Sequence, residues 1–518
     1  MLSDYPKFID VWTETGIDRA AGEVVLTPTP TGFHVDVAAP TAALTQIVLR
    51  WQRPLAATIR ILGDHWERGY GDLEWRGFVP ERVLPWYALL FDPEKESTEG
   101  IGVETGARSF ASWRVDETGI TLILDIRNGS KGVRLGDRML RAATIRTLAS
   151  QNGESPFAFA RRFCTLLSPK PRLPGFPVYG GNDWYYAYSN NSDESIRRDA
   201  ALIRDLSPNR DNAPFMVIDA GWFPARGCNG GPYAQGYETF PDMPGLAEAM
   251  KAMEVRPGIW IRPLLTAEAP STWQMPADHP IWKREKCCVL DPSVPEVLER
   301  VRGDIARLRA WGYTLIKHDF TTYDITGRWG FEMMDGTLSP GAWNFADRTR
   351  TTAEIIRDLY QTIRDAAEEV VLIGCNTVGH LGAGLFELQR TGDDTSGREW
   401  ERTRKMGINT LAFRMAQHDT FFAVDADCVG LTKEIPWELN QQWLALLAAS
   451  GTPLFVSADP AAIGPEQRAA LTAAFALAAE IQPPAEPLDW LNTTAPRHWR
   501  FGDEAREFNW SQPNAPGK

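Results

Sequence analysis

The spacing of apolar and polar residues divides the chain into two parts with different periodicities. From about residue 7 to residue 150, short stretches alternate apolar and polar side chains, as in Gly32–Val37 and Ile120–Leu124, and Gly, Pro, Asp and Asn separate these stretches. Alternation with a period of two places the apolar side chains on one face of a strand. This part is therefore predicted to be an antiparallel β-sandwich.

A stiff, proline-rich connection follows this part. Residues 168–174 read Ser-Pro-Lys-Pro-Arg-Leu-Pro, directly after a short helical pattern that begins near Phe157. Such a segment is typical of a domain boundary. We therefore expect a β-sandwich over residues 1–170, a second domain over 171–465, and a short C-terminal segment of helix and strand over 466–518.

In the second part, short apolar runs alternate with longer helical patterns. The helical patterns include Glu194–Leu206, Val294–Trp311, Asp347–Ala367 and Trp437–Ala449. The eight predicted strands are Pro177–Trp184, Phe215–Trp222, Arg256–Leu264, Thr314–Phe320, Val370–Asn376, Leu385–Arg390, Thr420–Asp425 and Pro453–Ser457. This alternation predicts an α/β fold of the (β/α)8 TIM barrel type. A doubly wound open sheet is the alternative, but no Gly-rich phosphate loop follows the first strand.

Composition and charge narrow the range of partners. The formal net charge is −13, and Lys and Arg form no clusters, so nucleic acid is not expected as a partner. The 20 Trp residues exceed what core packing usually needs, and flat indole rings suit the C–H faces of sugars. Packing in a large core explains the same count. Carbohydrate is therefore a first hypothesis for the ligand.

The cysteines and the termini bear on the compartment. The six cysteines lack the paired spacing of metal ligands and are interpreted as free thiols; they are Cys164, Cys228, Cys287, Cys288, Cys375 and Cys428. The first residues show no basic stretch followed by an apolar run, and no apolar stretch of about 18 residues occurs. We therefore expect a cytoplasmic protein without a membrane partner. The oligomeric state, including a homo-oligomer, is left open.

The end of the fourth predicted strand carries candidate chemistry, as expected for a barrel of this type. In Lys317-His318-Asp319, a period of two places Lys317 and Asp319 on one face and turns His318 toward the helical layer. A Lys beside a carboxylate keeps the carboxylate ionised, as a carboxylate nucleophile requires. A structural Lys–Asp ion pair explains the same residues.

The sixth predicted strand runs into a second candidate element. Arg390 precedes Asp393 and Asp394 after a Gly, so that the Arg would orient a substrate while one acid protonates the leaving oxygen. A turn or a helix cap explains the two acids equally well. Cleavage of a glycoside usually takes two carboxyl groups, about 5–5.5 Å apart for retention and farther apart for inversion. Together with Asp319, these acids indicate a glycosidase.

These two elements resemble those of the α-galactosidase clan of glycoside hydrolases, families 27 and 36, with family 36 the more similar. The resemblance covers Tyr179–Pro460, and family 36 also has a β-sandwich before its barrel. In the family, the Asp of Lys-x-Asp is the nucleophile and the Asp of Arg-x-x-x-Asp is the acid/base. The resemblance thus implies Asp319 as nucleophile and Asp394, not Asp393, as acid/base.

Two further segments fit the resemblance. They are Asn182-Asp183-Trp184 after the first strand and Asp425-Ala426-Asp427-Cys428 after the seventh. The resemblance implies that Lys317, Arg390 and Asp427 contact the sugar. A calcium site is a poorer interpretation of Asp425 and Asp427, since two carboxylates without further oxygen ligands bind calcium weakly.

The second and third strands depart from the family. Where the galactosidases have Asp-Asp-Gly-Trp, this chain reads Asp219-Ala220-Gly221-Trp222, so one of two acids that hold galactose hydroxyls is missing. An unpaired hydroxyl costs about 1–3 kcal/mol, which is enough to change the preferred sugar. Arg262 stands where an acidic residue is more usual. It would bind an anionic sugar or, equally, pair with Asp219.

We therefore expect a retaining, exo-acting α-glycoside hydrolase that resembles α-galactosidases, acts on an oligosaccharide or glycoside, and needs no metal or other cofactor. The alternatives are an α-glycosidase or transglycosylase of the same fold for a different, anionic or 6-modified sugar, and a carbohydrate-binding barrel without catalysis. The expected catalytic residues are Asp319 and Asp394. The expected substrate-binding residues are Trp184, Asp219, Trp222, Trp260, Arg262, Lys317, Asn376, Arg390 and Asp427.

Overall fold

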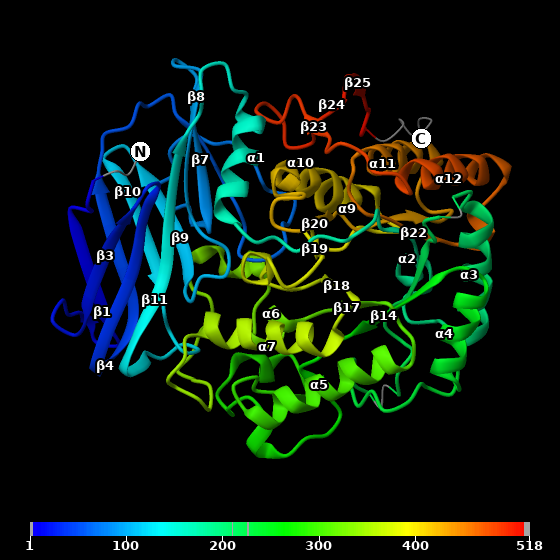
Figure 1. Ribbon diagram of the computed structural model, residues 1–518, viewed down its shortest axis with the longest axis horizontal. Helices are drawn as coiled ribbons and strands as arrows, with labels where there is room; N and C mark the ends of the chain where they lie inside the picture. The colour runs from blue at the N-terminus through cyan, green and yellow to red at the C-terminus, as the bar shows by residue number, and fades with distance from the viewer. Residues whose placement is uncertain (1–3, 210, 225–226, 512–518) are drawn as a thin grey trace, which may run out of the picture.

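The computed structural model describes residues 4–209, 211–224 and 227–511. Residues 1–3 and 512–518, at the ends of the expected first and last units, lie outside the described residues. Figure 1 shows the N-terminal strands at the left, in blue and cyan, beside a larger unit of strands and helices in green, yellow and orange. Both expected fold types are confirmed.

The N-terminal unit is antiparallel and barrel-like. Its eleven strands in the described residues form one sheet: β1 (Phe8–Thr13), β2 (Gly16–Ile17), β3 (Glu23–Thr29), β4 (Gly32–Gln52), β5 (Arg60–Gly63), β6 (Leu84–Pro85), β7 (Tyr87–Asp92), β8 (Ser97–Val103), β9 (Phe110–Asp116), β10 (Gly119–Asp125) and β11 (Val133–Ala149). The first half of β4 pairs with β3 and β11, and its second half pairs with β1 and β10. Register shifts between β4 and β11 bend these long strands, because an extra residue kinks a strand.

Helix α1 (Pro156–Leu167) leads from this sheet to the second unit. The side chain of Ser155 accepts a hydrogen bond from the backbone N–H of Ala158, and a proline occupies the first turn. Phe157, Phe159 and Phe163 are buried, so the helix is held by its apolar face.

The second unit is a closed parallel barrel. Its strands are β12 (Tyr179–Asn182), β13 (Phe215–Ile218), β14 (Arg256–Ile261), β17 (Leu315–His318), β18 (Val371–Gly374), β19 (Leu388–Arg390), β20 (Ala423–Asp425), β21 (Cys428–Leu431) and β22 (Leu454–Ala458). Each of the eight predicted strands overlaps one of them. Because β12 pairs in parallel with both β13 and β22, the open-sheet alternative is wrong.

The seventh barrel strand is split into two pieces. β20 pairs with β19, whereas β21 pairs with β22, so the barrel closes through Ala426 and Asp427 between them. Asp427 has a left-handed backbone with φ of 74°. Such a bulge re-aims side chains at a barrel rim.

Helices surround the barrel strands (Figure 1). They are α2 (Trp184–Ala187), α3 (Asp193–Leu206), α4 (Met243–Ala252), α5 (Pro295–Ala310), α6 (Thr321–Thr326), α7 (Thr352–Ala367), α8 (Gly379–Gly382), α9 (Trp400–Thr403), α10 (Thr410–Arg414), α11 (Trp437–Ala449) and α12 (Pro465–Ala478). Two small sheets complete the fold: β15 (Leu265–Thr266) with β16 (Cys288–Val289), and β23 (Glu486–Pro487) with β24 (His498–Phe501) and β25 (Glu504–Glu507). No helix within the described ranges is long and apolar enough to cross a membrane.

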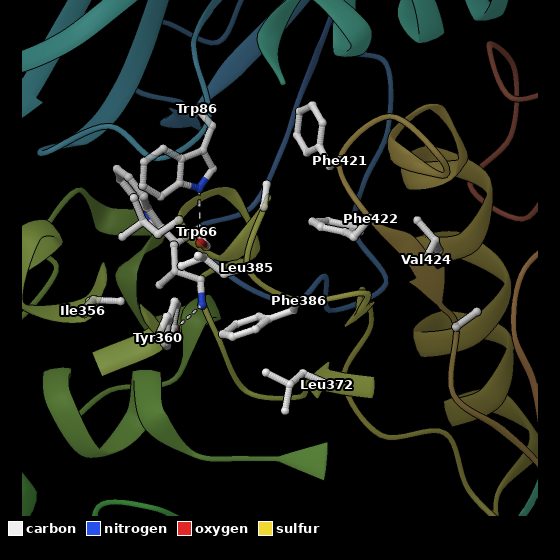
Figure 2. Packing of buried hydrophobic residues seen from close by; sticks show 14 of the residues in the cluster. Trp66, Trp86, Ile356, Tyr360, Leu372, Leu385, Phe386, Phe421, Phe422 and Val424 are labelled. Atoms are coloured by element: carbon white, nitrogen blue, oxygen red, sulfur yellow. Dashed lines mark hydrogen bonds between the residues drawn. The ribbon is translucent and has the colours of Figure 1, made fainter. Parts of the chain in front are cut away.

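The two units share one hydrophobic core. Figure 2 shows Trp66 and Trp86 of the N-terminal unit facing Tyr360 and Phe386 of the barrel, and all four belong to a single buried cluster. The ring of Trp86 also stacks on His380 at 4.6 Å between ring centroids. The barrel is therefore packed against the sheet through apolar contacts rather than tethered by a flexible linker.

A loop of the N-terminal unit reaches the rim of the barrel. This segment, residues 64–73, is called the wedge loop below. The backbone N–H of Gly69 donates to the carbonyl of Thr391 at 2.7 Å, and the N–H of Asp393 donates to the carbonyl of Gly69 at 2.9 Å. The side chain of Arg414 donates to Asp64 at 2.7 Å. These bonds fix the loop beside the carboxyl end of β19.

Candidate active site

A small cavity of about 100 Å³ lies at the carboxyl ends of the barrel strands. Six of the predicted site residues line it: Trp184, Asp219, Trp260, Lys317, Asp319 and Asp394. Six further residues complete its wall: Arg68, Ala220, Asn229, Phe320, Trp329 and Asp393. Carboxylates, cations and indole rings thus converge on one small space.

Asp319 follows strand β17 and is held by three donors. One carboxylate oxygen accepts from the backbone N–H groups of Phe320 at 2.7 Å and Asn376 at 3.0 Å, and the other accepts from Nε1 of Trp260 at 3.1 Å. Phe320 has a left-handed backbone with φ of 63°, an unusual conformation for a residue with a large side chain. Burial raises the pKa of Asp319, but Lys317 and Arg68 outweigh burial and leave this pKa below its ordinary value. The carboxylate is therefore ionised and fixed.

Lys317 and Asp219 form a buried ion pair beside Asp319. The Nζ of Lys317 lies 2.7 Å from Oδ2 of Asp219, which also accepts from the side chain of Asn182 at 2.8 Å. Burial would lower the pKa of Lys317, but the charge of Asp219 raises it well above the ordinary value. The lysine thus stays cationic at the cavity wall, where it can donate to a hydroxyl.

Asp394 is the more accessible of the two predicted catalytic acids, with 39% of its side chain exposed. Arg390 donates to its Oδ1 at 3.1 Å, and a nitrogen of Arg68 lies 3.7 Å from the same oxygen. Burial raises the pKa of Asp394, yet Arg390, Arg68 and Lys317 together lower it to about 2. Without a substrate, Asp394 is a carboxylate at neutral pH.

Arg68 was not expected at this site. It comes from the wedge loop, its side chain is 5% exposed, and it lies 3.1 Å from Asp393 and 3.4 Å from Glu67. Its guanidinium also sits over the ring of Trp329 at 5.7 Å. The sequence offers one signal: the stretch between β5 and β6 is too long for a hairpin, and long loops in compact domains are often functional.

Two of the predicted site residues, Trp222 and Arg262, lie behind the cavity. Nε1 of Trp222 donates to the carbonyl of Trp260 at 2.8 Å, so this indole supports the wall from outside. Arg262 is 2% exposed and pairs with Asp324 and Glu285. The expected pair between Arg262 and Asp219 is wrong, because Lys317 takes Asp219. The interpretation of Arg262 as a ligand for an anionic sugar stays a prediction, but the two carboxylates that pair with its guanidinium disfavour it.

Asn376, Arg390 and Asp427 were expected to bind substrate, but they lie beneath the cavity wall. The side chain of Asn376 donates to Glu67, while its backbone N–H holds Asp319. Arg390 bridges Asp394 and Asp427, at 3.1 and 2.9 Å. Asp427 also accepts from the backbone N–H of Thr395 at 2.8 Å. These side chains are held by protein partners, although the buried Nε of Arg390 has no acceptor among the described residues, and they orient the groups that face the cavity.

Two other polar residues at the strand ends, His318 and Asp425, pack or hydrogen-bond within the protein. His318 is fully buried and packs on Phe386 and Tyr360, in the helical layer as expected. Oδ1 of Asp425 accepts from the backbone N–H of Asp427 at 2.9 Å and so shapes the turn that closes the barrel. In the part of the chain that the structure describes, no three His, Cys, Asp or Glu side chains are grouped to hold a metal ion.

Comparison with known structures identifies the fold. The α-galactosidase of Thermus thermophilus, solved with p-nitrophenyl α-D-galactopyranoside, is similar with a TM-score of 0.61 and 19% identity over 93% of this chain and 99% of that one. The GH36 α-galactosidase AgaA of Geobacillus stearothermophilus gives 0.60 and 14% over 99% and 84%. The α-galactosidase of Lactobacillus brevis gives 0.58 and 12% over 91% and 72%.

The sequence itself matches no protein-family profile and no curated protein. The similarity therefore lies in the fold, which family 36 α-galactosidases share with this chain over most of its length. The resemblance inferred from the two acidic elements is confirmed at that level. The Thermus enzyme has also been solved with stachyose, and a variant of the Geobacillus enzyme with raffinose.

Proposed function

We propose that this protein is a retaining, exo-acting α-glycoside hydrolase with α-galactosidase-like specificity. One observation carries the proposal: Asp319 and Asp394 line the same cavity at the carboxyl ends of the barrel strands, together with Lys317 and Trp260. Both carboxylates face this space, which favours a hydrolase over a carbohydrate-binding barrel without catalysis.

The proposed reaction has two displacements. In the first, Asp319 attacks the anomeric carbon, the glycosidic C–O bond breaks, and protonated Asp394 gives its proton to the leaving oxygen. In the second, Asp394 takes a proton from water, and the oxygen of this water displaces Asp319 from the anomeric carbon. Two inversions give net retention, and Asp394 takes up in the second step the proton that it gave in the first.

The surroundings of Asp319 support its role as nucleophile. Lys317 and Arg68 keep it ionised, and three N–H donors fix both oxygens. Such a carboxylate meets the sugar without reorganisation.

The charges around Asp394 define when the first step is possible. With a pKa of about 2, this residue is a base in the free enzyme, as the second step requires. The first step requires the protonated form, whose population grows as the pH falls. A glycoside with a poor leaving group should therefore be cleaved faster at acidic pH, whereas a nitrophenyl glycoside needs less proton transfer and should respond less.

The identity of the sugar depends on Ala220, which lines the cavity where the galactosidases have a second acid. A galactose hydroxyl at this point would lack one acceptor. This favours testing other α-linked sugars, including 6-modified ones, beside galactose, and testing transfer to a second sugar beside hydrolysis.

The test is release of p-nitrophenol from a panel of α- and β-linked pyranosides by the wild type, Asp319→Ala and Asp394→Ala. We expect cleavage of one α-glycoside, a loss of about 10³-fold or more in each variant, and a β-glycosyl azide from Asp319→Ala with azide. Asp393→Ala serves as the matched control, because this neighbouring acid also lines the cavity. Full activity in either catalytic variant would exclude the assignment.

A further inference from the structure

A second and larger cavity lies on the outer face of the N-terminal sheet. It has a volume of about 540 Å³ and is called the sheet-face cavity below. Strands β1, β4, β10 and β9 lie side by side here. Gln46 of β4 pairs with Trp12 of β1 and with Asp125 of β10, and Thr121 lies on the same face of β10 as Asp125, so the four side chains line one face of the sheet. The barrel segment Asp335–Leu338 closes one side. The cavity is thus built by a rigid sheet and by the barrel together.

The acidic side chains of this cavity already have partners. Asp116 accepts two hydrogen bonds from Arg50, at 2.7 and 2.8 Å. Asp125 pairs with Arg127, and Asp335 pairs with Arg328 at 3.1 Å. Their negative charges are therefore balanced, so the cavity does not require a cationic ligand.

Two donors of the cavity wall have no acceptor. Arg114 makes no hydrogen bond and no ion pair with any described residue, and its Nε is buried. Nε1 of Trp12 is likewise buried without an acceptor among the described residues. Since an unsatisfied buried donor costs about 1–3 kcal/mol, a ligand that brings neutral acceptor oxygens would bind favourably.

Apolar surface accompanies these donors. Val48 and Ile123 are cross-strand partners beneath the cavity, and the indole of Trp12 stands beside them. An aromatic plane, an apolar floor and unpaired N–H donors match the C–H faces, the ring oxygen and the hydroxyls of a pyranose. A peptide or a phosphorylated ligand matches this combination less well.

The sheet-face cavity and the catalytic cavity are lined by neighbouring residues of two segments, the wedge loop and η3. Trp66 lines the former and Arg68 lines the latter, two residues apart in the wedge loop. The 3-10 helix η3 (Gly330–Asp335) begins after Trp329, at the catalytic cavity, and ends at Asp335, at the sheet-face cavity. The wedge loop and η3 therefore connect the two cavities through a few residues of chain.

We propose that the sheet-face cavity is a second saccharide-binding site, which takes a neutral glycan chain and holds it on the enzyme. Trp12 supplies the stacking surface, and Arg114 and the Trp12 indole N–H donate to the sugar oxygens. The site is separate from catalysis. The glycan used to test this site is chosen from the proposed function. Hydrolysis is therefore measured in parallel, so that failure of the proposed function can be told from failure of the binding site.

The experiment is native electrophoresis in gels that contain galactomannan, a neutral chain with α-linked galactose, and in gels that contain polygalacturonate, an anionic chain. The proteins are the wild type, Trp12→Ala, Arg114→Gln, and the controls Trp437→Ala and Arg506→Gln, which alter residues outside the cavity. Thermal unfolding shows whether each variant folds. Hydrolysis of the nitrophenyl glycoside found active with the wild type is recorded in parallel.

We expect galactomannan to retard the wild type and both controls, with about tenfold weaker binding in Trp12→Ala and in Arg114→Gln and less than twofold change in hydrolysis. The proposal is overturned if the wild type is not retarded, if both cavity variants are retarded like the wild type, or if polygalacturonate alone retards it. A different result separates the two proposals. If the wild type cleaves no glycoside but is retarded by galactomannan, and both cavity variants lose this retardation, the proposed function is wrong and the binding site is supported.

Discussion

Arg68 reaches the catalytic cavity from a different unit than the one that supplies the two carboxylates. Its charge lies 3.7 Å from Asp394 and contributes to the low pKa of Asp394 and of Asp319. Arg68→Gln should raise the pKa of Asp394, because less positive charge then stabilises its carboxylate. The pH–rate profile of kcat/KM on an oligosaccharide of the sugar found active should therefore move toward higher pH, and kcat/KM on the nitrophenyl glycoside should fall by about tenfold as a charged donor is lost.

Arg68→Lys and Arg402→Gln are the matched controls for this prediction. Lysine keeps the charge, so the profile should stay in place, and Arg402 pairs with Asp393 at 2.7 Å without lining the cavity. An unmoved profile in Arg68→Gln would show that Arg68 only holds the wedge loop.

Ala220 is the second residue whose replacement is informative. Ala220→Asp restores the acid that galactosidases have here, next to Asp219 at the cavity wall. We expect the ratio of kcat/KM for the α-galactoside to that for the best other α-glycoside to rise by about 10- to 100-fold, because a galactose hydroxyl regains an acceptor. Ala220→Asn has the same shape without the charge, and an equal rise in both variants would point to shape rather than charge.

At the scale of elements, the wedge loop depends on close contact with α10. A Cβ on Gly69 would lie 2.7 Å from the methyl carbon of Thr410. Gly69→Ala should therefore shift the loop and with it Arg68, lowering kcat/KM by about tenfold and stability by about 1–3 kcal/mol. Thermal unfolding and the nitrophenyl assay check both effects.

The double variant Gly69→Ala/Thr410→Ser tests this cause. Serine lacks the methyl but keeps the hydroxyl that donates within the helix. Activity and stability should return most of the way to those of Thr410→Ser alone. A double variant as impaired as Gly69→Ala would locate the strain elsewhere, for instance at Leu73.

The helices and strands were predictable where the local spacing of apolar residues determines the secondary structure. β14 and β22 are buried on both faces, and their continuous apolar runs mark parallel strands. α11 begins and ends at the predicted residues, because Pro436 and the chain after Ala449 bound one apolar helical pattern. The split of the seventh strand was not predictable, since Asp425-Ala426-Asp427 is also typical of a simple turn after a strand.

The sequence predicted those site residues that stand at the end of a barrel strand, but not those that come from other segments. Asp319, Lys317 and Asp219 follow from alternation at strand ends, and the cavity lies there. The partners of Arg262 did not follow, because Asp324 and Glu285 come from two other segments. Arg68 lies more than 300 residues from Asp394 in the sequence, and only tertiary packing brings the two together.

At the scale of the whole molecule, the interface between the two units should respond to pH. His380 is 4% exposed, stacks on Trp86, and hydrogen-bonds to the carbonyl of Val103. Burial lowers the pKa of His380 to about 4, so the folded protein keeps this ring neutral. The unfolded chain takes up the proton first, so this stabilisation is complete above about pH 6.5 and is lost as the pH falls to about 4, at a cost of about 3 kcal/mol.

Chemical denaturation between pH 8 and pH 4 measures this loss. In His380→Gln the free energy of unfolding should be lower at pH 8 and should fall less steeply between pH 6.5 and pH 4. His498→Gln, at an exposed position, should follow the wild type. Equal slopes in all three proteins would place the acid sensitivity at other groups.

The shared core also determines the order of events during synthesis. The ribosome releases Trp66 and Trp86 long before Tyr360 and Phe386, their partners in the buried cluster. The barrel cannot close until β22 pairs with β12, some 270 residues after β12 has emerged. A nascent chain must therefore carry an uncovered apolar face for most of its translation, which makes this period the one in which it depends most on chaperones.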